Sequence, residues 1–153
     1  AEKLAGRLDR YVIQPLLDWP QLALEQLDLL AEEGVPPEVV IVSHLGDRKG
    51  VEHMLPIADR GAWINIDNLA FIEGYAPLQF RIDNIVEMCR RGFAERMMLS
   101  NDICELGQLA TYGGVGYDNV ITNVIPRLRE QGVSDADIHQ MTVINPSKAF
   151  AFR

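Results

Sequence analysis

The chain has 153 residues, of which 48% are hydrophobic and 24% are charged, and its formal net charge is -8 at pH 7. These values are typical of one soluble globular domain that is long enough to bury a core. The negative charge argues against nucleic acid or an anionic membrane surface as a partner, and no apolar run reaches the ~20 residues that span a bilayer.

The start of the chain and its cysteines bear on location. The residues from Ala1 to Arg7 lack the basic region and apolar stretch of a secretory signal. Cys89 and Cys104 are too few and too irregularly placed for a disulfide framework or a zinc knuckle. We therefore expect reduced thiols and a cytoplasmic protein.

In chain order, residues 1–20 are an unassigned segment and residues 21–153 form one structural unit. Pro15 and Pro20 interrupt any long helix in the first segment, and residues 11–13 suit either a helix or a short strand. The unit that follows opens with leucines at helical spacing, which predict a helix that ends at a glycine.

Three later segments share one plan, an apolar strand that ends on a polar side chain. The strands are expected near residues 39–43, 62–66 and 96–100, and the groups that follow them are His44, Asp67 and Asp102. Because the carboxyl ends of parallel strands meet at one edge of a sheet, these side chains are expected to share a site.

Helices and loops fill the intervals between and after these strands. Apolar residues at helical spacing predict helices over residues 51–60, 78–91, 120–131, 135–141 and 145–152. The loop over residues 68–77 is a candidate lid. The glycine-rich loop over residues 103–117 is expected to shape the mouth of a pocket. The alternation of strands and helices predicts a parallel α/β sheet.

His44 is the first candidate for chemistry, because an imidazole at the end of a strand can bind a divalent ion or move a proton near neutral pH. The alternative is a buried histidine that bonds to a neighbouring loop. Asp102 follows an apolar strand, where an unpaired carboxylate is costly, so we expect it to have a cation or several donors as partners. A helix N-cap is the alternative for Asp102, and ordinary turn chemistry is the alternative for Asp67.

Other charged residues have simpler interpretations. His53 and His139 are expected to be solvated helix residues. Arg48 and Lys49 either pair with Asp47 or meet an anionic substrate, and a solvated loop is the simpler expectation.

Six motifs in this order resemble one family over the chain from about Leu22 to the end. They read Val42-Ser43-His44-Leu45-Gly46-Asp47, Asn65-Ile66-Asp67, Leu99-Ser100-Asn101-Asp102, Tyr112-Gly113-Gly114-Val115-Gly116-Tyr117, Ile125-Pro126-Arg127-Leu128-Arg129 and Asn145-Pro146. Together they resemble the carboxy-terminal part of the phosphotriesterase family in the amidohydrolase superfamily, which includes phosphotriesterases and lactonases.

The resemblance implies a TIM (β/α)8 barrel, of which this chain carries about the last three β/α units and the C-terminal helices. It further implies two divalent metal ions, usually zinc, with His44 as a ligand of one ion and Asp102 as a ligand of the other. By the same resemblance, Asp102 helps remove the proton of the metal-activated hydroxide that attacks the substrate. Asp67, Asn68 and Tyr117 are assigned to the substrate pocket.

The sequence departs from this family in its remaining ligands. It has no His-x-His pair, and no histidine precedes His44, although the histidine of the family's fifth strand is expected near Leu16. A catalytic zinc normally takes about three protein ligands, so two hold a metal weakly. A complete barrel of this type has roughly 250 residues. An open half-barrel leaves strand edges uncovered, and we therefore expect a homo-oligomer or association with the missing part of the barrel.

These observations favour a metal-dependent hydrolase that acts on a small-molecule ester, lactone or organophosphate. The alternative is a non-catalytic α/β binding or scaffold domain derived from the same fold. A flavodoxin-like ligand binder is a third possibility, but the turn at Gly46 has too few glycines for a phosphate loop.

Overall fold

The computed structural model describes residues 11–13, 20–70 and 76–151. Its centre is a parallel four-stranded sheet in the order β1-β2-β3-β4, in which each strand pairs with the next one along the chain. The strands are β1 (Tyr11–Ile13), β2 (Val40–Val42), β3 (Trp63–Ile66) and β4 (Met97–Leu99). The last three are the strands expected from sequence. β1 settles the choice left open for residues 11–13, because it pairs with β2.

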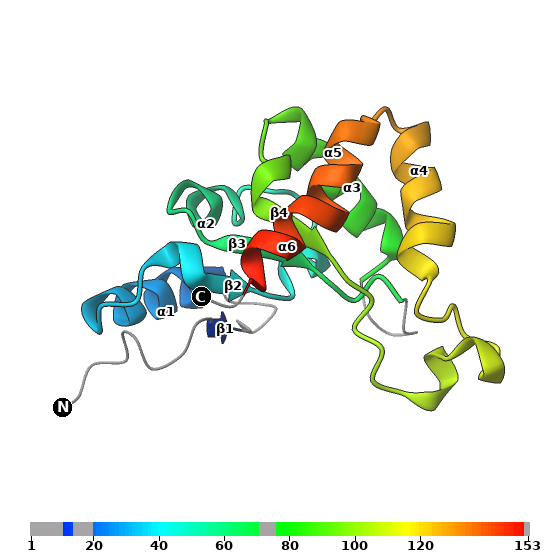
Figure 1. Cartoon of the computed structure of the whole chain (residues 1–153), viewed down its shortest axis with the longest axis horizontal. Coiled ribbons are helices and arrows are strands. Elements are labelled where there is room, and N and C mark those ends of the chain that lie inside the picture. Colours follow the sequence, from blue (N-terminus) through cyan, green and yellow to red (C-terminus); the bar gives the residue numbers. More distant parts are fainter. Residues whose placement is uncertain (1–10, 14–19, 71–75, 152–153) are drawn as a thin grey trace.

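Helices follow the strands and pack around the sheet (Figure 1). The α-helices are α1 (Pro20–Glu32), α2 (Leu55–Asp59), α3 (Leu78–Arg90), α4 (Ile125–Glu130), α5 (Asp135–His139) and α6 (Asn145–Ala149). Short 3-10 turns are η1 (Pro37–Val39), η2 (Leu45–Asp47), η3 (Ala94–Arg96), η4 (Leu106–Gln108) and η5 (Ala110–Tyr112). No helix in the described ranges is long and apolar enough to cross a membrane.

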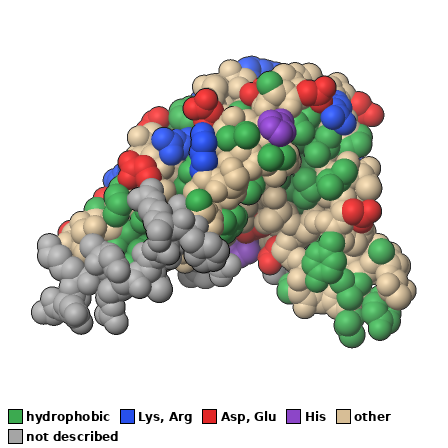
Figure 2. Space-filling model, in the orientation of Figure 1, with side chains coloured by type: hydrophobic (Ala, Val, Ile, Leu, Met, Phe, Trp, Pro, Cys, Tyr) green, Lys and Arg blue, Asp and Glu red, His purple; other side chains and the backbone are tan. Residues whose placement is uncertain are grey.

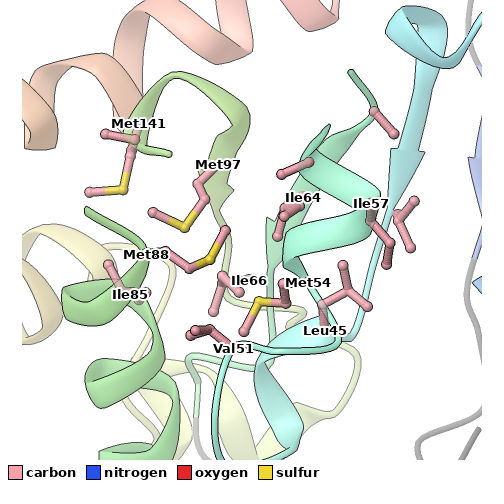
Figure 3. Packing of buried hydrophobic residues seen from close by; sticks show 14 of the residues in the cluster. Leu45, Val51, Met54, Ile57, Ile64, Ile66, Ile85, Met88, Met97 and Met141 are labelled. Carbon is pink, nitrogen blue, oxygen red and sulfur yellow. The ribbon is translucent and has the colours of Figure 1, made fainter. Parts of the chain in front are cut away.

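The two faces of the sheet contribute to two clusters of buried side chains. Successive residues of a strand point to opposite faces, so alternate positions join different clusters. Ile64, Ile66 and Met97 pack with the helices in the main core, which Figure 3 shows together with Ile85 and Met88 of α3. The opposite face carries a smaller cluster of Ile41, Trp63, Met98 and Ala149, the last of which belongs to α6. At the level of Ile41, Trp63 and Met98, buried side chains therefore pack on both faces of the sheet.

In the last part of the chain, a wider π-helical turn precedes each of two prolines, and the helix continues past the proline. The π-helical turns η6 (Val120–Val124) and η7 (Gln140–Ile144) come directly before Ile125-Pro126 and Asn145-Pro146. Proline has no N–H and its ring collides with the carbonyl four residues earlier, and a π turn accommodates both effects without ending the helix. A separate helix was expected from residue 145, whereas helical structure continues without interruption from Asp135 to Ala149. The expected N-cap is confirmed: Ser134 Oγ accepts from the backbone N–H of Asp137.

Candidate active site at the carboxyl ends of the strands

Backbone strain marks the ends of three neighbouring strands. His44, Asn68 and Asp102 have φ values of 61°, 56° and 52°, and they are the non-glycine residues with positive φ in the described ranges. They lie just beyond β2, β3 and β4. Residues with a side chain adopt this left-handed conformation at a cost, and such residues cluster at functional sites. The structure therefore brings the expected candidate positions to one rim of the sheet.

Asp67 holds His44 through both its backbone and its ring. The backbone N–H of His44 donates to Asp67 Oδ1 at 3.0 Å and to Oδ2 at 3.2 Å, and His44 Nδ1 lies 2.9 Å from Oδ1. Because a carboxylate only accepts, Nδ1 carries the hydrogen and donates. This arrangement fixes the ring and leaves Nε2 with its lone pair, which is how a carboxylate orients a histidine that binds a metal or accepts a proton.

Negative charge surrounds this imidazole. The hydrogen bond that His44 donates to Asp67 raises the pKa of His44 above its ordinary value of 6.5, and the charges of Asp67, Asp102 and Asp47 raise it further, while partial burial acts in the opposite direction. The carboxylate of Asp102 therefore acts on the His44 ring. Such a field also favours a bound cation.

The residues that precede the strand-end site on the same face of the sheet form a polar layer, and Asn65 of this layer binds Asp67. Asn65 Nδ2 is 3.3 Å from each of Ser43 Oγ, Asp67 Oδ2 and Ser100 Oγ. Ser43, Asn65 and Ser100 come from β2, β3 and β4 or from the residue after the strand. They alternate with main-core positions such as Ile66, so they share one face of the sheet. Asp67 is only 4% exposed and depends on this layer and on His44 for its donors.

Asp102 stands in a different environment from the one expected. Its side chain is exposed, so the argument that burial demands a partner for it was wrong. The loop that carries it is nevertheless held firmly. Buried Asn119 donates to Leu69 O at 2.7 Å and to Asn101 Oδ1 at 3.1 Å, and Ala70 N donates to Asn101 O at 3.2 Å. These bonds tie the strand ends of β3 and β4 together.

Three buried polar residues in this region were missed by sequence reasoning. They are Arg81, Gln108 and Asn119. Arg81 had a readable signal, because it falls on the apolar face of its helix, three residues after Leu78 and four before Ile85. Gln108 and Asn119 had none, since both lie in or beside an irregular loop whose partners are distant in sequence.

Several other expectations are corrected or refined. His53 is not a solvated helix residue: it precedes α2, its Nε2 lies 2.8 Å from Leu45 O, and burial lowers its pKa. Asp47 pairs with Arg81 rather than with Arg48 or Lys49. Those two cations line a hollow of about 410 Å³ between α1 and the turn before α2.

The pocket loops are described only in part. Tyr117 is 74% exposed, and its carbonyl accepts from Asn101 Nδ2 at 2.8 Å. Residues 71–75 of the candidate lid, and Leu16 near the expected fifth-strand histidine, lie outside the described residues.

The described residues supply only part of a metal site. His44 and Asp102 are suitable donor types, but within residues 11–13, 20–70 and 76–151 there is no group of three His, Cys, Asp or Glu placed to hold an ion. A catalytic zinc takes about three protein ligands. The described residues therefore do not make a complete metal centre, and further ligands are needed for one.

Comparison with known proteins gives a consistent result. A model described as the phosphotriesterase family matches residues 12–150. A phosphotriesterase homology protein of Escherichia coli (strain K12) is 37% identical over 129 residues, which cover 84% of this chain and 44% of that protein. The chain thus spans less than half the length of this curated relative.

Several solved structures also resemble the chain, and each is covered over less than half of its length. The crystal structure of the phosphotriesterase homology protein from Escherichia coli, with phosphate in its active site, superimposes with a TM-score of 0.86 at 34% identity and covers 93% of this chain and 48% of that one. A lactonase from Listeria monocytogenes gives 0.79 at 27% identity, covering 88% and 42%. A resiniferatoxin-binding protein from Rhodobacter sphaeroides gives 0.83 at 28% identity, covering 92% and 41%.

Proposed function

Because the chain belongs to the phosphotriesterase family, we propose that its strand-end site takes part in metal-dependent hydrolysis of a small ester, lactone or phosphotriester. The fold is the α/β fold of the family's TIM barrel, and the chain corresponds to its carboxy-terminal part. The family includes hydrolases and generally binds divalent metals. Since the chain spans less than half of its relative, the activity of a complete barrel is part of the proposal.

The observation that carries this proposal is the His44–Asp67 pair. Nδ1 is bound to a carboxylate that is 4% exposed, and Nε2 has no hydrogen bond within the described part of the chain. A histidine that only stabilises the fold has no need of an ionic partner on one nitrogen and an open lone pair on the other. In this proposal Nε2 binds a divalent ion, most simply zinc, and strands outside this chain supply further ligands.

Asp102 has the complementary role. Its carboxylate is exposed at the same rim, it adds to the negative field on His44, and it has no hydrogen bond within the described residues. We assign it as the second metal ligand of this chain and as the group that accepts a proton from the attacking water. A bound metal supplies the lowered pKa of that water and polarises the substrate oxygen. Asp67 holds the imidazole, and Asn68 and Tyr117 contact the substrate.

Metal content tests the proposal. In solutions of zinc, manganese, cobalt or iron, the full chain should take up metal by equilibrium dialysis and elemental analysis, and H44A should take up less, whereas H139A, a change at an exposed helix residue, should not. Hydrolysis of a lactone and of a phosphotriester should depend on the same residue. If no metal is found and H44A changes neither metal content nor hydrolysis, the enzyme proposal fails for this chain.

A second candidate is a non-catalytic binding or scaffold domain. The incomplete donor set favours it, as does the absence of any histidine before His44. The similar structure named as a resiniferatoxin-binding protein gives a precedent for binding within this fold. This candidate predicts saturable binding of a small ligand that a chelator does not weaken and that yields no product. In either case, the two free cysteines fit a reducing compartment, and we propose a cytoplasmic location.

A further inference from the structure

A buried ion pair ties helix α3 to the turn beside His44. Arg81 and Asp47 have side chains that are 1% and 2% exposed, and Arg81 Nε donates to Asp47 Oδ1 at 2.6 Å. Arg81 Nη1 also donates to Ala76 O at 2.8 Å. Asp47 belongs to η2, which begins directly after His44. The guanidinium of Arg81 thus binds the turn that follows His44 at the candidate site.

Gly46 makes this approach of helix and turn possible. A Cβ at position 46 would lie 3.3 Å from Arg81 Cγ and 2.7 Å from Ile66 Cγ2. A side chain at this position would collide with Ile66 and crowd Arg81. The glycine therefore belongs to the same arrangement as the ion pair.

The second oxygen of Asp47 continues the path toward the site. Asp47 Oδ2 accepts from Asn68 Nδ2 at 2.8 Å. Asn68 is 8% exposed and has the left-handed φ of 56°, and its Nδ2 lies 3.4 Å from His44 Nδ1. Hydrogen bonds therefore run from Arg81 through Asp47 to Asn68, and Asn68 contacts the His44 ring without a hydrogen bond, because both nitrogens carry hydrogen.

Fold stability alone does not account for this pair. Removing two charges from water costs free energy that their attraction barely recovers, and apolar side chains of similar volume are often at least as stable in the same place. The neighbouring positions of α3 are apolar and fully buried, as at Ile82, Ile85 and Met88. Packing of α3 alone therefore does not require a charged pair at this position.

We propose that Arg81 is a positioning residue for the strand-end site. It holds the Asp47 carboxylate, Asp47 fixes the amide of Asn68, and Asn68 stays in its left-handed conformation beside His44. The consequence for catalysis rests on the proposed function, because it concerns the same site. The placement of Asn68 can be measured without any substrate.

The test replaces the pair by apolar side chains. R81M/D47L replaces both charges by apolar side chains, so it should still fold, with a urea midpoint lowered by the loss of the bonds to Ala76 O and Asn68 Nδ2. In NMR spectra of the full chain, the side-chain amide signals of Asn68 should lose their protection from exchange, and its backbone carbon shifts should move away from left-handed values. Unchanged Asn68 signals in the folded variant would overturn the inference.

Asn84 provides a matched control on the same helix. Its side chain bonds to Gly46 O at 3.2 Å, to Arg48 O at 2.6 Å and to Gly50 N at 3.0 Å, so it anchors the same turn without contacting Asn68. N84A should lower the urea midpoint and leave the Asn68 signals in place. If N84A releases Asn68 as fully as R81M/D47L does, the pair is only a general anchor and the inference is wrong.

Two further measurements keep the outcome decisive. Should R81M/D47L fail to fold, R81Q/D47A removes both charges and the oxygen that accepts from Asn68 Nδ2. Shifted Asn68 signals in that variant support the inference, and wild-type signals overturn it. Zinc titration of the wild-type chain separates this claim from the proposed function: a released Asn68 in a chain that binds no zinc leaves the positioning role standing while the hydrolase proposal fails.

Discussion

At the scale of single residues, the centre of the account is the bond between His44 and Asp67. Sequence reasoning found both residues, because each directly follows a strand whose apolar pattern is clear. It did not find that they bind each other, since a contact over 23 positions depends on the register of β2 and β3. Asp102 was found for the wrong reason, as its carboxylate is exposed rather than buried.

The variant D67N tests this bond by NMR. The hydrogen bond and charge of Asp67 raise the pKa of His44, so an uncharged amide at position 67 should lower the pKa toward the ordinary value of 6.5. Titration of the His44 ring signals measures the shift directly. An unchanged midpoint would mean that the two side chains do not interact in solution.

The same variant has a signed effect on stability. A histidine whose pKa is raised on folding stabilises the folded state below the unfolded value of 6.5, and this contribution disappears as the pH rises through the folded-state pKa. The difference in unfolding free energy between wild type and D67N should therefore be larger at pH 5.5 than at pH 8. Urea denaturation at the two pH values checks the direction, and a difference that grows with pH would contradict it.

At the scale of elements, the regular helices could be predicted from the sequence, whereas the irregular turns and loops could not. Helix α1 (Pro20–Glu32) and helix α3 (Leu78–Arg90) lie where leucine and isoleucine spacing places them. The π turns were not foreseen, because proline normally signals the end of a helix and the tertiary contacts of Asn145 decide otherwise. The loop over residues 103–117 was recognised by its glycines, but its hydrogen bonds were not.

Asn145 should matter for stability beyond its size. It is fully buried, and its Nδ2 donates to Ala94 O at 2.7 Å and to Met97 O at 2.6 Å, joining the last helices to the start of β4. N145A leaves both carbonyls without this donor and should cost about 1–3 kcal/mol of unfolding free energy. The matched control is S147A, which removes an exposed bond to Ile144 O in the same helix. Equal urea midpoints for the two variants would show that the Asn145 bonds are not formed.

Gly114 should be irreplaceable in the loop after β4. A Cβ at this position would overlap the backbone of Gln108 and Gly107, whereas a Cβ at Gly107 meets nothing within 4 Å. G114A should therefore displace the loop and lower the thermal midpoint, and G107A should change neither. Amide chemical shifts over residues 104–118 report the displacement, and a G114A spectrum like that of wild type would contradict the described loop.

At the scale of the whole molecule, exposed apolar side chains gather on one projection of the chain. Figure 1 shows the segment with η4 and η5 projecting from the body, and Figure 2 shows hydrophobic side chains gathered on this projection. The exposed residues of this region include Leu106, Tyr112, Val115, Tyr117 and Ile121. Apolar surface of this kind marks sites of association, so we keep the proposal that the chain forms a homo-oligomer or associates with the rest of a barrel.

Molar mass in solution tests this proposal. Light scattering should give a mass above the 17.2 kDa of one chain, falling toward that value on dilution. Y112S/Y117S should shift the equilibrium toward the monomer, because both tyrosines are exposed on the projection, at 65% and 74%. A wild-type mass of one chain at every concentration would exclude self-association through this surface.

The central claim is that His44 and Asp102 belong to one divalent-metal site at the rim of the sheet. Paramagnetic broadening by Mn²⁺ is the most direct test, because it detects weak binding by an incomplete ligand set. The account predicts that amide signals of residues 44–46 and 101–103 broaden together at the same Mn²⁺ concentration, and that H44A or D102A abolishes both effects while H139A does not. Broadening of only one segment, or broadening that survives H44A and D102A, would contradict the account.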